Sequence, residues 1–327
     1  MLVTIIGATS WGTTLANLIS NNKIPTVLLT RTNSEKSMIE KNNSIPSLPD
    51  IKISQAIRIS ADASATLPES DVIILAVPSD RIQENLERIP SNLKENLIIV
   101  SGVKGLNSDS GDTMSSMIKK SIPIAKDRVV VISGPNLSRE IAQNIPSSTI
   151  VACENLLLAK TVKTLLDNRN FGVYLSDDVT GVELGGALKN VIAITAGIVD
   201  GLEYGANSKS IIVNKGLHEI LQLAIIFGGK SQTVFGLSGL GDLIATCFST
   251  LSRNRYVGEQ IGKGNQLYEI TKKMKNVAEG INTTKAALVL AKQHKLKLPL
   301  IEGTGSILFN NSNPRELINL LLSSPTD

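Results

Sequence analysis

Residues 2–12 read LVTIIGATSWG, a short apolar run that ends in a turn of small residues. The residues that follow, 12–20, have the spacing of an amphipathic helix. A glycine-rich turn between a first strand and a first helix directs backbone N–H groups and the helix N-terminus toward a pyrophosphate. We therefore predict that residues 2–6 form the first strand of a dinucleotide-binding domain.

The turn matches the spacing G-x-G-x-x-G, except that Thr9 stands at the second glycine. That glycine normally lets the backbone approach the phosphates closely. Candidate cofactor-binding residues in the turn are Gly7, Ser10, Trp11 and Gly12. Two alternatives stay open. The turn could need small residues only for packing, and Trp11, the single tryptophan in what we expect to be an exposed turn, could be a packing plug between domains rather than a wall for the ligand.

The first half of the chain alternates apolar, β-branched runs with helical patterns. The predicted strands are Leu2–Ile6, Thr26–Thr30, Val72–Val77, Leu97–Ser101, Val129–Ser133 and Thr149–Val151. The predicted helices between them include Gly12–Ser20, Asp80–Arg88 and Asp112–Ser121. Apolar strands separated by helices are typical of a parallel sheet covered on both faces. The pattern predicts an α/β fold with a doubly wound, Rossmann-type parallel sheet.

From about residue 180 the pattern changes to long helices. They are predicted at Val179–Val199, Ser208–Phe227, Val257–Ile261 and Thr283–Gln293, with a Gly-rich connection at Ser231–Leu243. The length of 327 residues also favours two domains. We predict that residues 1–180 form the dinucleotide-binding domain and residues 181–327 an all-helical substrate and catalytic domain.

The composition favours a globular enzyme with aliphatic cores, because 42% of the residues are hydrophobic and only 3% are aromatic. The net charge of +4 is too small to favour a nucleic-acid partner. Two cysteines far apart and two histidines indicate neither a disulfide framework nor a metal site. We find no leader pattern and no uninterrupted apolar stretch that could span a bilayer. We expect a cytoplasmic protein without stable membrane insertion, whose C-terminal helices could form a homodimer.

The second predicted strand is followed by Arg31. An acidic residue near this point would bind the ribose 2′-hydroxyl of NAD, whereas an arginine suits the 2′-phosphate of NADP. Arg31 therefore slightly favours NADPH over NADH. The alternative is a solvated charge at a strand end.

Five segments follow one another along the chain: Gly7–Gly12 with Trp11, Ser101–Gly105, Ser133–Asn136, Glu183–Asn190 and Leu251–Arg255. Their order resembles that of bacterial NAD(P)-dependent glycerol-3-phosphate dehydrogenases, over residues 2 to about 305. The segments around Lys189, at residues 236–255 and at residues 277–280 are specific to that family. The resemblance implies interconversion of dihydroxyacetone phosphate and sn-glycerol 3-phosphate with NADPH or NADH. It also implies that the product supplies glycerophospholipid synthesis.

Reduction of a ketone needs a proton for the oxygen atom, and the resemblance places the family's proton donor and acceptor on Lys189. The surrounding predicted helix is rich in Ala, Val, Ile and Gly, and such an apolar setting lowers a lysine pKa toward neutrality. Gly185 and Gly186 would let substrate or another backbone approach. From the residues alone, a lysine that reaches from a domain seam to solvent is an equal alternative.

The resemblance implies further contacts. For the substrate they are at Lys104, Gly134, Asn136, Lys189, Asp242, Ser252, Arg253 and Asn254. For the cofactor they are at Gly7, Ser10, Trp11, Gly12, Arg31, Lys104, Ser138, Arg253, Val277 and Glu279. Asn136 and Ser138 stand where the family more often has serine and alanine, which we interpret as variation without loss of function.

Two predicted helix starts give a chemical reason for phosphate binding. Ser252 is a suitable N-cap for a helix that begins at Arg253, and helix N-termini attract phosphate. The basic first turn opposes the helix dipole unless an anion binds there. Pro135 after Gly134 predicts a second helix start, with N–H groups that could bind an anion.

Other interpretations of these residues stay open. Ser252–Asn254 could be a plain capped helix, Lys104 a surface lysine, Asp242 a helix N-cap and Glu279 a helix-start carboxylate. For the whole chain, the alternatives are a dehydrogenase of hydroxy acids or sugar acids and a catalytically silent NADPH sensor. The Ser252–Asn254 phosphate site argues against the first alternative, and the presence of Lys189 and Asp242 argues against the second.

Overall fold

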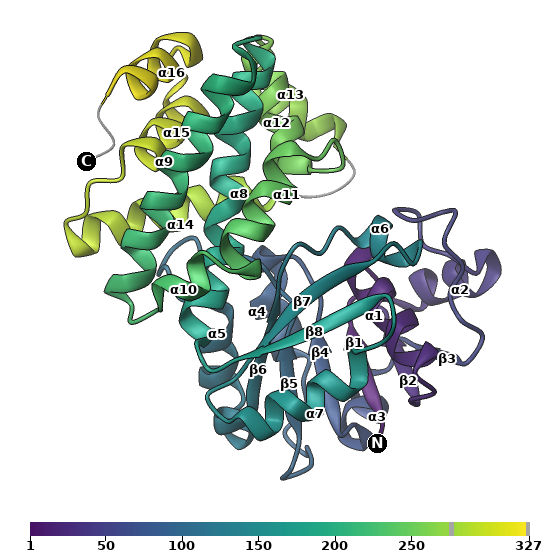
Figure 1. Cartoon of the computed structure of the whole chain (residues 1–327). Coiled ribbons are helices and arrows are strands. Elements are labelled where there is room, and N and C mark those ends of the chain that lie inside the picture. The colour runs from purple at the N-terminus through teal and green to yellow at the C-terminus, as the bar shows by residue number, and fades with distance from the viewer. Residues whose placement is uncertain (275–277, 325–327) are drawn as a thin grey trace. The chain divides into compact units, whose positions relative to one another are not determined.

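The computed structural model describes residues 1–274 and 278–324 (Figure 1). Contacts between residues divide the chain into two compact units. The first unit contains Met1–Val103 and Met114–Val179, and the second contains Lys104–Thr113 and the chain from Thr180 onward. The sequence-based division has a single boundary, at residue 180. The contacts additionally assign the loop Lys104–Thr113 to the second unit.

An eight-stranded sheet forms the centre of the first unit. Its strands are β1 (Val3–Ile6), β2 (Thr26–Leu29), β3 (Ile57–Ser60), β4 (Val72–Leu75), β5 (Ile98–Ser101), β6 (Val129–Ser133), β7 (Ser147–Ala152) and β8 (Phe171–Ser176). Their spatial order is β3-β2-β1-β4-β5-β6-β7-β8. Every neighbouring pair is parallel except β6 and β7. The predicted doubly wound α/β fold is confirmed, with one antiparallel pair, β6 and β7, that the sequence analysis did not anticipate.

Side chains alternate between the two faces of this sheet, as the pleat requires. In β4, Val72 and Ile74 belong to one hydrophobic cluster, whereas Ile73 and Leu75 belong to another. Because both faces are covered, the central strands are buried at every position and largely apolar, which explains why they were recognised from sequence. Strand β3 is at an edge and carries Arg58, and β8 is at the other edge. Neither was predicted, since half-exposed edge strands lack a continuous apolar run.

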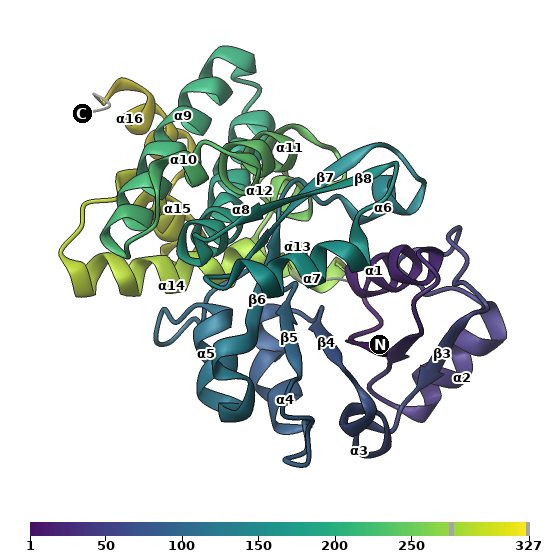
Figure 2. The same cartoon turned by 60° about the horizontal axis from the view of Figure 1, so that its bottom comes forward.

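The helices of the first unit pack on both faces of the sheet. They are α1 (Ser10–Asn21), α2 (Asn33–Asn42), α3 (Ala63–Thr66), α4 (Ile82–Glu87), α5 (Met114–Ser121), α6 (Ser138–Ala142) and α7 (Leu156–Leu166), with short 3₁₀ turns η1 (Leu67–Glu69), η2 (Ser79–Arg81) and η3 (Pro123–Arg128). Helices α1, α2 and α7 contribute to one cluster and α4 and α5 to the other (Figure 2). The loop after β1 therefore opens at the carboxyl edge of a covered parallel sheet, where such folds bind ligands.

Helices make up the second unit in the described residues. They are α8 (Val179–Gly201), α9 (Gly205–Ile226), α10 (Ser231–Val234), η4 (Leu237–Gly241), α11 (Asp242–Phe248), α12 (Arg253–Gly262), α13 (Leu267–Lys273), α14 (Glu279–His294), α15 (Pro299–Asn310) and α16 (Pro314–Ser323). The Gly-rich connection predicted at residues 231–243 is largely helical. That stretch contains α10, the π-helical turn η4 and the start of α11. Its glycines hid the helices, because glycine is a poor helix former outside a packed interior.

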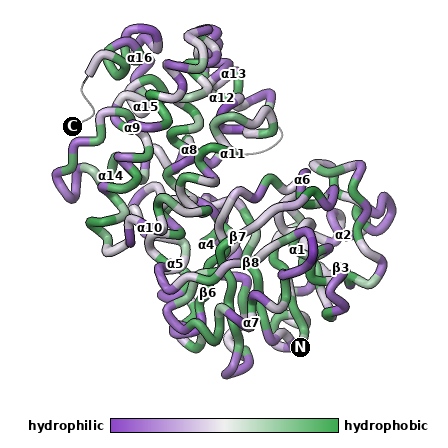
Figure 3. The backbone as a smooth tube through the Cα atoms, in the orientation of Figure 1, coloured by the Kyte–Doolittle hydropathy of each residue, from purple (hydrophilic) through white to green (hydrophobic). Residues whose placement is uncertain are grey.

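One helix of the described chain, α8, is long and apolar enough to cross a membrane, and the bent pair formed by α10–α11 and α12 meets the same criterion only when taken together. The apolar window of α8 is wholly buried. Its side chains belong to the hydrophobic core of the second unit, so α8 has the position of a core helix in a soluble protein. Figure 3 shows the same pattern along the backbone, with hydrophobic strands and helices and hydrophilic connections.

Candidate active site

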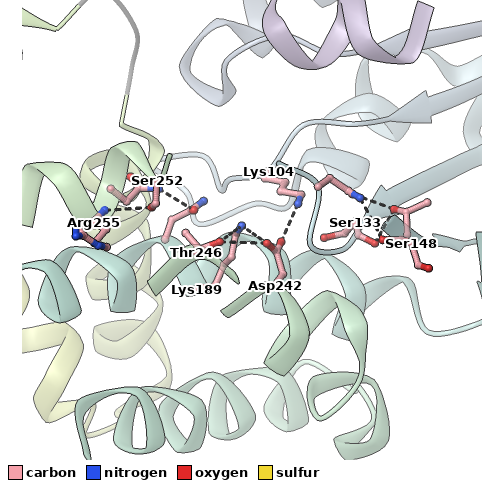
Figure 4. Close-up of polar contacts among 12 residues, drawn as sticks. Lys104, Ser133, Ser148, Lys189, Asp242, Thr246, Ser252 and Arg255 are labelled. Atoms are coloured by element: carbon pink, nitrogen blue, oxygen red, sulfur yellow. Dashed lines mark hydrogen bonds and ion pairs between the residues drawn. The ribbon is translucent and has the colours of Figure 1, made fainter. Parts of the chain in front are cut away.

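Lys189 lies in the buried helix α8 with its side chain only 8% exposed. Its Nζ donates a hydrogen bond of 2.7 Å to Thr246 Oγ1 and a second one to Asp242 Oδ1 (Figure 4). Both partners come from α11, and they stand four residues apart on one face of that helix. A lysine has three N–H donors, so one remains for a ligand.

Lys104 reaches the same carboxylate from the loop that follows β5. Its Nζ donates a 2.7 Å hydrogen bond to Asp242 Oδ2, and its side chain is 17% exposed (Figure 4). Asp242 itself is 2% exposed. Two lysines thus share one carboxylate and leave a net positive charge in a buried setting. Such a setting stabilises negative charge that develops on a nearby oxygen.

The pKa of Lys189 is lowered from 10.5 to about 8. Burial lowers this pKa most, the charge of Asp242 raises it, and the charge of Lys104 lowers it. A group with a pKa near the working pH can both donate and accept a proton. The structure therefore gives Lys189 the electrostatic setting of an acid–base group and not that of a lysine whose head group reaches solvent.

Glycines bring the helices of this cluster together. A Cβ on Gly185, one turn before Lys189, would lie 3.0 Å from the Cα of Gly239 in the π-helical turn η4. Gly185 thus allows another backbone to approach closely. We expected its lack of a side chain to admit either a backbone or the substrate. Turn η4 passes directly into α11, so Asp242 is the first residue of that helix and Gly241 is its N-cap. The alternative of Asp242 as the N-cap is therefore wrong.

The predicted phosphate segment starts α12. Ser252 is its N-cap, with Oγ accepting a 3.2 Å hydrogen bond from Arg255 N. Asn254 donates to Asn190 Oδ1 at 2.8 Å and accepts from Gly280 N at 2.9 Å. Since Asn190 follows Lys189 directly, this contact fixes the α12 N-terminus beside the lysine. Asn190 and Thr246 were not predicted as site residues from the sequence. The only available signal was position, since Asn190 is one residue after Lys189 and Thr246 is four residues after Asp242.

The two arginines at the start of α12 differ. Arg255 pairs with Asp200 at 3.2 Å and with Glu259 at 2.8 Å. Arg253 is exposed and makes no ion pair with any residue that the structure describes, although the charge of Glu279 acts on it. Glu279 is the first residue of α14, so the helix-start interpretation fits its place. Val277 lies outside the described residues.

In the first unit, the loop after β1 has the shape that the motif predicts. Gly7 has a φ of +113°, and a Cβ there would lie 2.8 Å from Ala76 O. A Cβ on Gly12 would clash with the carbonyl oxygen of Gly7. The packing of the loop therefore excludes a side chain at both positions, and we call this loop, Gly7–Gly12 at the N-terminus of α1, the glycine cradle.

Helix α1 begins at Ser10, two residues before the prediction. Ser10 Oγ donates a 2.8 Å hydrogen bond to Ser47 Oγ. The expectation that Trp11 lies in an exposed turn was wrong. Trp11 is the second residue of α1, and its partly buried side chain packs against the hydrophobic cluster to which α1 contributes. Arg31 is exposed directly after Thr30, and its backbone N donates to Glu35 Oε2 at 2.8 Å.

The segment after β6 differs from the prediction. Helix α6 begins at Ser138 with Leu137 as its N-cap, so Pro135 does not open a helix. Gly134 is buried and has a φ of +156°, and a Cβ there would lie 3.0 Å from Thr149 Cα, so the chain bends in close contact with β7 at this point. Asn136 is held by the same strand, because its Oδ1 accepts from Thr149 Oγ1 at 3.0 Å. Ser138 O accepts a 3.2 Å hydrogen bond from Thr14 Oγ1.

Two family models together match nearly the whole chain. Residues 2–159 match the NAD-dependent glycerol-3-phosphate dehydrogenase N-terminus, and residues 178–319 match the C-terminus of the same family. The chain belongs to this family. The resemblance stated from the sequence is confirmed, and the chain is an NAD(P)-dependent oxidoreductase.

Relatives of this dehydrogenase family match over the full length. A glycerol-3-phosphate dehydrogenase [NAD(P)+] of Agathobacter rectalis is 40% identical over 321 residues, which cover 98% of this chain and 95% of the relative. The crystal structure of glycerol-3-phosphate dehydrogenase from Coxiella burnetii superimposes with a TM-score of 0.92 at 30% identity, covering 99% of both chains. D-mandelate dehydrogenase shares only the fold, with a TM-score of 0.62 at 13% identity.

Among the described residues, no three His, Cys, Asp or Glu side chains gather as metal ligands would. Both cysteines are buried and free, and burial raises the pKa of Cys247 to about 12, so it is not an activated nucleophile.

Proposed function

We propose that this dehydrogenase interconverts dihydroxyacetone phosphate and sn-glycerol 3-phosphate, with Lys189 as its acid–base residue. The observation that carries the assignment is the buried cluster in which Lys189 and Lys104 share the carboxylate of Asp242. A ketone gains a proton on oxygen when it is reduced, and the alcohol loses that proton when it is oxidised. A lysine with a pKa of about 8 can serve both directions.

Each member of the cluster has a separate task in this mechanism. NAD(P)H, when bound, supplies the hydride for the carbonyl carbon. Lys189 Nζ transfers the proton to the carbonyl oxygen, and Asp242 and Thr246 hold that Nζ in place. Lys104 places a second positive charge beside the same carboxylate and stabilises the oxygen while its negative charge grows.

The phosphate of the substrate belongs, in this proposal, to the start of α12. Ser252 and Asn254 are buried there at 5% and 7% exposure, while Arg253 is exposed and has no ion-pair partner in the described chain. An arginine can bind a phosphate with two parallel N–H donors. Gly134 and Asn136 remain proposed substrate contacts on the strength of the resemblance alone.

For the cofactor, the proposal assigns the pyrophosphate to the Gly7–Gly12 cradle, with Ser10 and Trp11 in the first turn of α1. The remaining proposed cofactor contacts are Arg31, Lys104, Ser138, Arg253, Val277 and Glu279. Arg31 is exposed where a 2′-phosphate would lie, which slightly favours NADPH. Calorimetric titration of wild type and Arg31→Ala with NADPH and NADH tests this preference. Equal effects of the variant on both cofactors would contradict it.

The proposal extends to the setting of the enzyme. Residues 1–180 serve as the dinucleotide-binding domain and residues 181–327 as the substrate and catalytic domain of a cytoplasmic enzyme that supplies glycerophospholipid synthesis. A homodimer through the helices of the second unit is supported by exposed apolar side chains, among them Ile244 and Phe248 on α11. Light scattering across a range of concentrations tests the oligomeric state, and a monomer at every concentration would exclude the dimer.

The deciding experiment measures the oxidation of NADPH and of NADH by dihydroxyacetone phosphate, in wild type and Lys189→Ala. Loss of a positioned acid typically costs about 10²- to 10⁴-fold in rate. We expect a loss of that size with cofactor binding retained. If the wild type binds NADPH but does not reduce this ketone, the substrate assignment fails, and carboxylate substrates such as 2-keto acids are the next to test.

A further inference from the structure

Thr9 occupies the second glycine position of the cofactor loop, and its backbone does not require a glycine. Its φ of −86° and ψ of 171° are extended values that any residue adopts. Gly7 and Gly12, by contrast, have no room for a Cβ. The second position therefore differs physically from the first and third, because a side chain there costs the loop no strain.

The hydroxyl of Thr9 makes two hydrogen bonds. Oγ1 donates to Ala76 O at 2.7 Å and accepts from Gly12 N at 3.1 Å. Ala76 follows β4 directly, so the first contact ties the start of α1 to the neighbouring strand of β1. On the other side, Gly7 N donates to Leu29 O, the last residue of β2, at 3.1 Å. The loop is thus anchored to both strands that flank β1.

The second contact selects which N–H groups remain for a ligand. The first N–H groups of a helix lack partners within the helix. In α1, the N–H of Thr13 bonds to Thr9 O at 2.9 Å, and the N–H of Gly12 is used by the Thr9 hydroxyl. The N–H groups of Ser10 and Trp11 are then the donors that the first turn directs outward.

We propose that Thr9 is a positioning residue for the cofactor pyrophosphate, which fixes the Ser10 and Trp11 N–H groups in their binding direction before the cofactor arrives. The proposal rests on the cofactor assignment under the proposed function, and it does not depend on the substrate. Pre-ordering a loop favours binding because the ordering entropy no longer opposes association. The hydroxyl of Thr9 is thereby a functional part of this loop and not a tolerated departure from the motif.

The sharpest test is Thr9→Gly, which restores the glycine of the motif. Glycine is itself a fair N-cap, so the start of α1 loses little stability, while the tie to Ala76 is removed. Thr9→Val removes the hydroxyl and keeps the shape, Thr9→Ser keeps the hydroxyl, and Thr161→Val is a control on the exposed face of α7. Calorimetric titration without substrate gives the dissociation constants for NADH and NADPH.

We expect Thr9→Gly and Thr9→Val to weaken binding of both cofactors by about fivefold, the size of one hydrogen bond, and Thr9→Ser to restore it to within about twofold. The kcat at saturating cofactor stays unchanged, so the effect appears in KM for the cofactor. Wild-type or tighter binding by Thr9→Gly would overturn the proposal, as would a Thr9→Ser variant as weak as Thr9→Val. If Thr9→Val does not fold, the Gly and Ser variants still decide. A wild type that binds cofactor but fails to reduce dihydroxyacetone phosphate would refute the proposed function alone.

Discussion

The carboxylate of Asp242 determines the electrostatics of the lysine–aspartate cluster. It accepts hydrogen bonds from two lysines that are 53 and 138 residues away in sequence. Without this carboxylate two positive charges would face each other in a nearly solvent-free setting. The negative charge of Asp242 raises the pKa of Lys189 and so opposes the effect of burial. Lys189 therefore keeps its proton to a higher pH than it would without Asp242.

We predict that Asp242→Asn lowers the pKa of Lys189 below about 8, because the largest opposing interaction is lost. In the proposed mechanism, reduction needs the protonated lysine, so the rate of reduction should begin to fall at a lower pH than in wild type. At pH 8 we expect a loss of about 10- to 100-fold, a typical size for a displaced acid. Profiles of kcat/KM against pH measure this, with the exposed Asp127→Asn as control. An unshifted profile would show that Asp242 does not set the pKa of the acid.

Helices α8 and α12 meet backbone to backbone, and glycines make this possible. A Cβ on Gly197 of α8 would clash with the carbonyl oxygen of Arg255, and one on Gly258 of α12 would clash with that of Ile194. The close approach lets Asn254 reach Asn190 at 2.8 Å. The packing of two elements thus determines where the predicted phosphate site lies relative to the lysine.

We predict that Gly258→Ala destabilises the chain by about 2–4 kcal/mol, because overpacking a rigid contact forces backbone to move. Gly303→Ala in α15 is the matched control. Its Cβ would lie 3.4 Å from the nearest atom, on the side chain of Leu321, so this variant should be neutral or slightly stabilising. Urea unfolding followed by circular dichroism measures both. Equal stability of the two variants would contradict the role of the close contact.

Helix α15 is capped by a buried carboxylate from another helix. The two oxygens of Glu219 in α9 accept from Leu300 N at 2.6 Å and from Ile301 N at 3.0 Å. Burial raises the pKa of Glu219 from 4.5 to about 7, with a smaller contribution from Glu302, while both hydrogen bonds and Lys215 oppose the shift. The folded chain therefore binds more protons than the unfolded chain between these two pH values.

The stability contributed by protonated Glu219 should accordingly fall as pH rises from about 4.5 to about 7. The Glu219→Gln variant cannot titrate at this position. In this variant, the pH dependence of the free energy of unfolding that comes from residue 219 should therefore vanish. The free energy of unfolding in urea, measured at intervals from pH 5 to 8 for both proteins, isolates the difference. Parallel curves for wild type and variant would mean that Glu219 has an ordinary pKa.

Across the whole chain, the two units carry different chemistry. The first holds the glycine cradle at the carboxyl edge of its sheet, and the second holds the buried lysines and the capped start of α12. The family model for the N-terminus matches residues 2–159 and that for the C-terminus matches residues 178–319, so both halves of the chain match the same family.

NADPH at 100 times its dissociation constant should raise the free energy of unfolding of the part that binds it by about 2.7 kcal/mol. We expect hydrogen exchange to slow chiefly in the first unit, in the Gly7–Gly12 loop and in β1 and β4. Nicotinamide alone, which lacks the pyrophosphate, is the control and should leave these amides unchanged. Protection confined to α8–α12 of the second unit would contradict the assignment of the cofactor to the glycine loop.

Much of the first unit followed from the sequence by itself. Strands β1, β4 and β6 are largely apolar because they are buried on both faces, and the glycine loop follows the first of them directly. These are local signals, carried within a dozen residues. The apolar setting of Lys189 is local too, since α8 is apolar nearly all round, and the capping of α12 by Ser252 needs only neighbouring residues.

Only the tertiary structure decided the remainder. The edge strands β3 and β8 exist because a neighbour supplies their hydrogen bonds, and the helices in the glycine-rich stretch exist because close packing favours small residues there. Asp242 pairs with Lys104, 138 positions away, and with Lys189, 53 positions away. Thr9 donates a hydrogen bond to Ala76 O, 67 positions away. No local pattern specifies such contacts, because they depend on which elements fold against one another.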